Sequence, residues 1–178
     1  GSTPIFTFNM MLVGPKAVPK FHIFLPCHLV QLLSETPNPP VCAVLLIQKE
    51  VAERATAKPG NMSLLSITTQ FYWEPSLGPL AELFTPPPKV DSQILILQRR
   101  AQQLFPDEEP KDFFRLVKAG FSQKRKTLLN SLSAGLNLDK SRTLALLETA
   151  GLAPTLRPQN LGLSDWHSLL RAQAAANR

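Results

Sequence analysis

Five cations gather in a short stretch that the sequence predicts to be helical. They are Arg115, Lys118, Lys124, Arg125 and Lys126. On a continuous helix, positions 118 and 125 differ by only about 20° around the axis, so Arg115, Lys118 and Arg125 would share one face with Ser122. Cations beside a hydroxyl and an amide suit contacts with nucleic-acid phosphates. The plain alternative is a solvated helix face with no partner.

The charge and the prolines divide the chain of 178 residues into two segments. Residues 1–98 carry six basic and six acidic side chains, whereas residues 99–178 carry thirteen and seven, so the whole net charge of +6 lies in the second segment. Of the 17 prolines, 13 lie at or before Pro88. We therefore expect two domains, 1–98 and 99–178, with the boundary near Arg99 and Arg100.

The first segment is predicted to alternate helices and strands. Val41–Ile47 is a run of seven apolar residues, a pattern typical of a central strand buried on both faces of an α/β sheet. Helices are expected over residues 27–34, 48–57 and 63–69, and further strands over 71–73 and 90–97. Three successive prolines, Pro86–Pro88, predict a stiff, extended connector before the last strand.

The second segment is predicted to be helical throughout. Pro110 suits a first helical turn, and apolar residues recur at helical spacing as far as Leu128, which predicts one helix from Lys111 to Ser131. A second helix is expected over residues 141–150, before Gly151. A third should start at Ser164 as its cap and turn three side chains inward. Those three are Trp166, Leu169 and Leu170.

The composition argues against several classes of protein. With 8 glycines, no Gly-x-Gly and no apolar run of about 18 residues, a self-contained nucleotide-binding or membrane-spanning protein is not expected. Cys27 and Cys42 have no partners at metal-ligand spacing, and the three histidines are scattered, so no metal site is predicted. The pair Gly1-Ser2 looks like a tag remnant, and no signal peptide follows it. Reduced thiols and no membrane segment favour the cytoplasm.

Four strings of the sequence together carry a family resemblance. They are VLLIQKEVAERATAK at 44–58, AELFTPPPKVDS at 81–92, AGFSQKRKTLLN at 119–130 and LRPQNLGLSDW at 156–166. In this order and spacing they closely resemble the small-subunit ribosomal RNA adenine N6,N6-dimethyltransferases, which are related to the Erm-type methyltransferases. The resemblance covers residues 41–178, and residues 3–40 match poorly.

The resemblance implies a Rossmann-like domain that uses S-adenosylmethionine, followed by a small all-α domain that helps to hold RNA. Residues 1–98 would supply its late strands and helices, with the N-terminal half of the domain incomplete, and residues 99–178 the helical domain. Such an enzyme transfers two methyl groups to N6 of each of two adjacent adenosines. The implied partner is small-subunit rRNA or the immature small ribosomal subunit, bound by a monomer. N6 is a poor nucleophile, so the amine must be held against the methyl donor and the base must leave its stack.

The family places an Asn-(Leu/Ile)-Pro-Tyr motif at the site of methyl transfer. Its best match here is Phe24-Leu25-Pro26-Cys27, in which Leu25 and Pro26 agree with the motif. Phe24 replaces the hydrogen-bonding Asn, and Cys27 replaces the stacking Tyr. The resemblance also implies that four residues border the entry of the flipped adenine, namely Pro86, Pro87, Pro88 and Lys89.

The cofactor loop of the family is not recognisable. Gly14 is the only internal glycine before residue 60, so the residues that would bind S-adenosylmethionine stay unknown. Either the chain is a truncated or rearranged member, or the sequence is what remains of a longer protein, and both explanations stay open.

Three functional hypotheses follow. The first is an rRNA adenine dimethyltransferase whose activity in these 178 residues is weak or absent. The second is a non-catalytic RNA-binding module that keeps the carboxyl half of the family's fold. A third, a DNA-binding helix-turn-helix protein, depends only on the basic helix.

Overall fold

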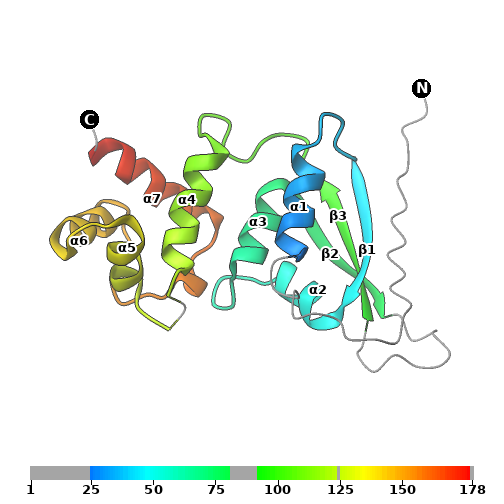
Figure 1. Cartoon of the computed structure of the whole chain (residues 1–178), viewed down its shortest axis with the longest axis horizontal. Coiled ribbons are helices and arrows are strands. Elements are labelled where there is room, and N and C mark those ends of the chain that lie inside the picture. The colour runs from blue at the N-terminus through cyan, green and yellow to red at the C-terminus, as the bar shows by residue number, and fades with distance from the viewer. Residues whose placement is uncertain (1–24, 81–91, 124, 177–178) are drawn as a thin grey trace. The chain divides into compact units, whose positions relative to one another are not determined.

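The computed structural model describes residues 25–80, 92–123 and 125–176, which form two compact units. Residues 25–56, 68–80 and 92–102 belong to an α/β unit, and residues 57–67 and 103–176 belong to a helical unit (Figure 1). The segment 57–67 joins the helical unit because the backbone N–H groups of Gly60 and Met62 both donate to the Gln159 carbonyl, at 2.9 and 3.1 Å.

The α/β unit contains a three-stranded antiparallel sheet. Its strands are β1 (Cys42–Gln48), β2 (Trp73–Leu80) and β3 (Ser92–Arg99), in the order β1-β3-β2. Because β3 is antiparallel to both neighbours, β1 and β2 run parallel to each other. Leu95 of β3 pairs with Leu45 of β1 on one side and with Leu77 of β2 on the other. The apolar runs in β1 and β3 therefore form strands, as the sequence predicted.

Three helices lie on one side of this sheet (Figure 1). They are α1 (Leu25–Glu35), α2 (Lys49–Ala55) and α3 (Leu64–Tyr72), close to the predicted spans. Helix α2 contacts all three strands. Its residues Ala52 and Ala55 are buried with Leu95 and Leu97 of β3. Small alanines let the helix approach the strands closely, and this layer forms the core of the unit.

The expectation that β1 is buried on both faces is wrong for this structure. Ala43 and Leu45 are buried, whereas Val44 is 49% exposed and Leu46 is 39% exposed. The reason is geometric, since successive strand residues point to opposite faces and the three helices lie on only one side. Within the described residues β1 also pairs with β3 alone and is an edge strand of the sheet.

The strand expected at 71–73 is also displaced. Phe71 and Tyr72 belong to the last turn of α3, and β2 begins only at Trp73. Phe71 is buried at helical spacing from the buried residues Ile67 and Thr68, so packing favours another helical turn over the local strand propensity of the aromatic residues.

The helical unit consists of α4 (Pro110–Phe121), α5 (Leu128–Leu136), α6 (Lys140–Thr149), a short 3₁₀ turn (Pro158–Asn160) and α7 (Leu163–Ala176). Helix α4 begins at Pro110 as predicted, and Trp166, Leu169 and Leu170 of α7 are buried as predicted. The prediction that α7 starts at Ser164 as its cap is wrong, because the helix already includes Leu163. At this helix start the Gly162 N–H donates a hydrogen bond to the Asp165 carboxylate at 2.8 Å.

No helix of the described residues is long and apolar enough to cross a membrane.

Candidate RNA-binding surface and methyl-transfer motif

Helix α4 has one buried face and one cationic face. Phe113, Leu116 and Val117 are fully buried. Three exposed cations, Lys111, Arg115 and Lys118, recur on the opposite side at intervals of four and three residues. This spacing places them in one stripe along the helix. We call these three residues the basic stripe; it contains two of the predicted RNA-binding residues and adds Lys111.

One acidic side chain accompanies the basic stripe. Arg115 Nη2 lies 3.6 Å from Asp112 Oδ1, and both side chains are more than half exposed. An exposed ion pair of this kind is worth at most about 1 kcal/mol, because water screens both charges. A phosphate group could therefore replace Asp112 as the partner of Arg115 with little loss of free energy.

The predicted continuous helix from Lys111 to Ser131 is wrong. Helix α4 ends at Phe121, where the Ser122 hydroxyl donates to the Ala119 carbonyl at 2.7 Å, and α5 begins at Leu128. In the turn between them the Lys126 N–H donates to the Gln123 carbonyl at 3.0 Å. Arg125 therefore does not share a helix face with Lys118, contrary to the prediction.

Two cations of this turn are nevertheless exposed, and hydrogen bonds hold the backbone around them in place. Arg125 and Lys126 are exposed, whereas Lys124 lies outside the described residues. The turn is anchored because the buried Ser131 hydroxyl donates to the Gln123 carbonyl at 3.2 Å. The Leu128 N–H also donates to the Leu156 carbonyl at 2.6 Å, which fixes the start of α5. A fixed turn holds its charges near one position and lowers the entropy cost of binding an anion.

The residues predicted to match part of the catalytic motif lie at the start of α1. Leu25, Pro26 and Cys27 occupy its first turn, and Phe24 lies outside the described residues. Proline suits this position because the first helical N–H groups have no partner within the helix. The structure thus places Leu25 and Pro26 together at a helix start.

The other end of α1 is fixed to β2 and to the last turn of α3 by two polar contacts that the sequence did not predict. Trp73 Nε1 donates to Ser34 Oγ at 2.8 Å, and the Tyr72 hydroxyl is hydrogen-bonded to the Glu35 carboxylate. Burial, followed by the charge and hydrogen bond of Glu35, raises the pKa of Tyr72 to about 12. Both contacts join residues more than 35 positions apart, so no local pattern could have indicated them.

The structure does not test the other predicted site residues of the α/β unit. Pro86, Pro87, Pro88 and Lys89 lie outside the described residues, in the link between the neighbouring strands β2 and β3. Among the described residues of the α/β unit, Gly78 is the only glycine, and it packs against Ile94. The described residues therefore do not fit the glycine-rich loop that the family uses for S-adenosylmethionine. They also contain no group of three or more His, Cys, Asp or Glu side chains able to hold a metal ion.

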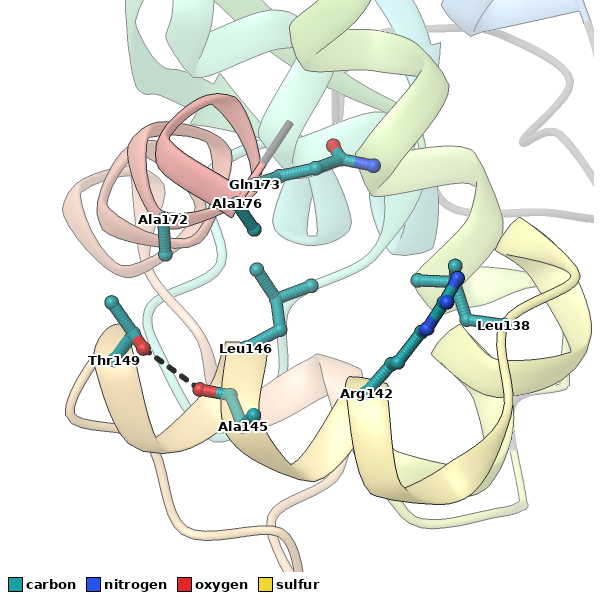
Figure 2. Close-up of a pocket in the computed structure, with 8 residues that line it drawn as sticks. All are labelled: Leu138, Arg142, Ala145, Leu146, Thr149, Ala172, Gln173 and Ala176. Carbon is teal, nitrogen blue, oxygen red and sulfur yellow. Dashed lines mark hydrogen bonds between the residues drawn. The ribbon is translucent and has the colours of Figure 1, made fainter. Parts of the chain in front are cut away.

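A shallow groove lies between α6 and α7 of the helical unit (Figure 2). Leu146 points from α6 toward α7, and the Thr149 hydroxyl is already bonded to the Ala145 carbonyl at 2.8 Å. Arg142 is its only charged lining residue, and its Nε lies 3.4 Å from Asp139 Oδ2. The groove brings no acid, base or nucleophile together, so it offers no chemistry of its own.

Comparison with known proteins decides the family. The family model described as "Ribosomal RNA adenine dimethylase" matches residues 27–172. The chain belongs to the ribosomal RNA adenine dimethylase family. The match includes nearly all of the described part of both units but only Cys27 of the partial motif, and the family resemblance drawn from the sequence is confirmed.

Curated relatives of this family are similar over most of the chain. The "Ribosomal RNA small subunit methyltransferase A" of Dehalococcoides mccartyi strain 195 is 36% identical over 156 residues, which make up 86% of this chain and 54% of that protein. The protein of the same name from Hydrogenovibrio crunogenus is 43% identical over 122 residues, 65% of this chain and 43% of its own length. The chain thus spans about half the length of these relatives.

Solved structures of the dimethylase family and of the related Erm type support the fold. A dimethyladenosine transferase from Plasmodium falciparum has a TM-score of 0.65 and 28% identity, covering 83% of this chain and 63% of that one. The 23S rRNA methyltransferase ErmE has a TM-score of 0.60 and 26% identity, covering 81% of this chain and 59% of its own. The α/β methyltransferase fold and the relationship to the Erm type, both predicted from the sequence, are confirmed.

Proposed function

We propose that this chain carries part of an enzyme that uses S-adenosylmethionine to dimethylate N6 of two adjacent adenosines in small-subunit rRNA. The observation that carries the proposal is the family match over residues 27–172. It is supported by the relatives named as small-subunit methyltransferases. The cytoplasm, where ribosomal subunits are assembled in bacteria, is the proposed location, and a monomer is the proposed state.

The helical unit would bind the rRNA backbone. Lys118, Arg125 and Lys126 are exposed, and Arg115 is held only by a solvent-screened ion pair. With Lys124 they would neutralise phosphates and release counterions, which gives affinity without base specificity. The fixed turn after α4 would keep Arg125 and Lys126 at a constant position relative to the basic stripe.

The methyl-transfer site would lie beside the first turn of α1. Leu25 and Pro26 would border the flipped adenine, with the segment Pro86–Lys89 on another side. S-adenosylmethionine would supply the electrophilic methyl group when bound, and residues beyond the described ones would have to hold it. The role of this chain's own residues would be to orient the base and to exclude water.

The test is methyl transfer to small-subunit RNA that lacks the modification. Because Phe24 and Cys27 replace the hydrogen-bonding and stacking residues of the motif, we expect little or no incorporation of labelled methyl groups by the 178 residues alone. The relative from Dehalococcoides mccartyi strain 195, which is named as a ribosomal RNA small subunit methyltransferase, provides the positive control. Incorporation at the rate of that control would contradict the expected role of the two replaced residues.

A second candidate function is a non-catalytic RNA-binding module. It is favoured by one observation, the lack of a glycine-rich loop among the described residues of the α/β unit. It predicts salt-sensitive binding to structured RNA and no binding of S-adenosylmethionine. Calorimetry with the cofactor separates the two functions, because measurable cofactor binding would exclude the module.

A further inference from the structure

Two half-buried aromatic side chains border the cations of α4. Phe114 lies three residues after Lys111 and four residues before Lys118. Phe121 follows Lys118 by three residues and Phe114 by seven, so the two rings share one side of the helix. Residues three and four apart are neighbours on a helix surface, so both rings lie beside the basic stripe. We call these two residues the aromatic border.

Each ring of the aromatic border packs on a buried aromatic ring. Phe114 meets the fully buried Phe113 edge to face, with ring centroids 5.5 Å apart and ring planes at 86°. Phe121 packs at a tilt on the fully buried Trp166, with ring centroids 5.8 Å apart. Both phenylalanines are nevertheless partly exposed. A ring that is already supported in this way loses little freedom when a ligand stacks on it.

The two rows of side chains match the two chemical sides of an RNA strand. Cations neutralise phosphates, and unpaired bases stack on aromatic side chains. Both rows extend along roughly 10 Å of α4, because each spans seven residues with a rise of about 1.5 Å per residue. The bases of a duplex are paired inside it and do not reach such rings, so only an unpaired strand can contact both rows.

We propose that the basic stripe and the aromatic border together form a binding site for unpaired RNA, with phosphates on the stripe and a base stacked on Phe114. The inference rests on the proposed binding of RNA by the helical unit and deepens it, because it names single-stranded nucleotides as the ligand of this face. Phe114 is the ring to test, since it lies between two cations, Lys111 and Lys118. A Phe114 that served only packing would be replaceable by another large apolar residue.

The experiment measures the affinity of the 178-residue chain for a labelled RNA of about 12 nucleotides without self-complementarity, and for its duplex with the complementary strand. We expect Phe114→Leu, which keeps an apolar side chain but removes the ring, to weaken binding of the single strand at least about fivefold. Binding of the duplex should change less than about twofold, and the salt dependence should stay that of the parent chain, because no charge is lost.

Phe105→Leu is the matched control. Phe105 is also a half-buried phenylalanine of the helical unit, but its ring stacks on the imidazole of His167, with centroids 4.0 Å apart, and it is not part of the aromatic border. This variant should leave the affinity for both RNA forms unchanged.

Phe114→Trp gives a direct readout of stacking. It should keep the affinity for the single strand, and its tryptophan emission should fall when that strand binds, because a base stacked on an indole quenches its fluorescence. The emission of the parent chain should change little, since Trp73 and Trp166 are fully buried. This variant decides the matter if thermal unfolding shows that Phe114→Leu does not fold.

Three results would overturn the inference. One is a folded Phe114→Leu variant that binds the single strand as tightly as the parent chain. Another is an equal loss of affinity for the single strand and the duplex, since stacking acts on unpaired bases alone. The third is a Phe114→Trp variant that binds the single strand without quenching.

The same measurements separate this inference from the proposed function. In each of the three cases the parent chain still binds RNA, so the proposed function stands. A parent chain that binds neither RNA form would contradict both. Binding of the single strand that depends on Phe114, in a chain that transfers no methyl group, supports the inference and counts against the proposed enzyme.

Discussion

Trp73 Nε1 donates a hydrogen bond to Ser34 Oγ across 2.8 Å, joining the first residue of β2 to the last turn of α1. Ser34 in turn donates to the Val30 carbonyl at 2.7 Å, so one hydroxyl links the buried indole to the helix backbone. Because α1 begins with Leu25 and Pro26, the contact also fixes the helix that carries the partial motif.

Ser34→Ala should lower the free energy of unfolding by about 1–3 kcal/mol, because it leaves the indole N–H of the fully buried Trp73 without an acceptor. Urea denaturation followed by tryptophan fluorescence measures this change. Trp73→Phe, made alone and with Ser34→Ala, closes a double-mutant cycle. If Ser34→Ala costs the same in the Trp73→Phe variant as in the parent chain, the hydrogen bond contributes nothing to stability.

The single tyrosine of the chain makes its ionisation directly observable. We expect the tyrosinate absorbance near 295 nm to rise with a midpoint at about 12 in the folded chain, because burial raises the pKa of Tyr72, with the neighbouring Glu35 adding to the effect. In the unfolded chain the midpoint should lie near 10. The unfolded state therefore loses the phenol proton at a lower pH than the folded state does. The contribution of neutral Tyr72 to the free energy of unfolding is complete below pH 10 and should disappear as the pH rises to about 12.

Glu35→Gln is the matched variant for this titration. It removes the negative charge beside the Tyr72 hydroxyl but leaves the burial, which is the largest cause of the raised pKa. The midpoint should therefore fall toward the ordinary value of 10 without reaching it. A midpoint equal to that of the parent chain would show that Glu35 does not face the phenol.

Gly135→Ala should destabilise the helical unit by about 1–3 kcal/mol. A Cβ at this position would lie 2.6 Å from the carbonyl oxygen and 2.7 Å from the Cα of Ala119, so α5 could accept it only by moving away from the α4 backbone. The matched control is Ala134→Ser on the exposed side of the same helix, which should change stability by less than about 0.5 kcal/mol. Thermal unfolding of both variants is the measurement. Equal midpoints would mean that the two helices are not in this close contact.

Much of the fold could be predicted because local patterns determine it. The apolar run of β1 predicts a strand, and Pro110 followed by amphipathic spacing predicts the start of α4. The end of α4 could not be predicted, because the residues after Phe121 tolerate a helix and apolar spacing continues to Leu128. The break depends on tertiary contacts, such as the bond from the Leu128 N–H to the Leu156 carbonyl.

The candidate site was less predictable than the fold. The exposed cations Arg115 and Lys118 follow from helical spacing alone, and the structure adds Lys111 to the same stripe. The prediction that Arg125 shares the face of Lys118 is wrong, because it requires an unbroken helix and α4 ends at Phe121. The exposure of Val44 was also unpredictable, since the burial of a strand depends on what covers it and not on its own sequence.

Lys118→Ala and Arg125→Ala should each reduce the salt dependence of binding to small-subunit RNA, lowering the slope of log K against log salt by about one, because each removes one phosphate contact. Lys140→Ala provides the control, since it removes one exposed charge from the start of α6 in the same unit without touching the basic stripe or the turn after α4. Filter binding at several salt concentrations measures the slopes. If Lys140→Ala lowers the slope as much as the other two variants, net charge drives RNA binding, and α4 with its following turn is not the contact surface.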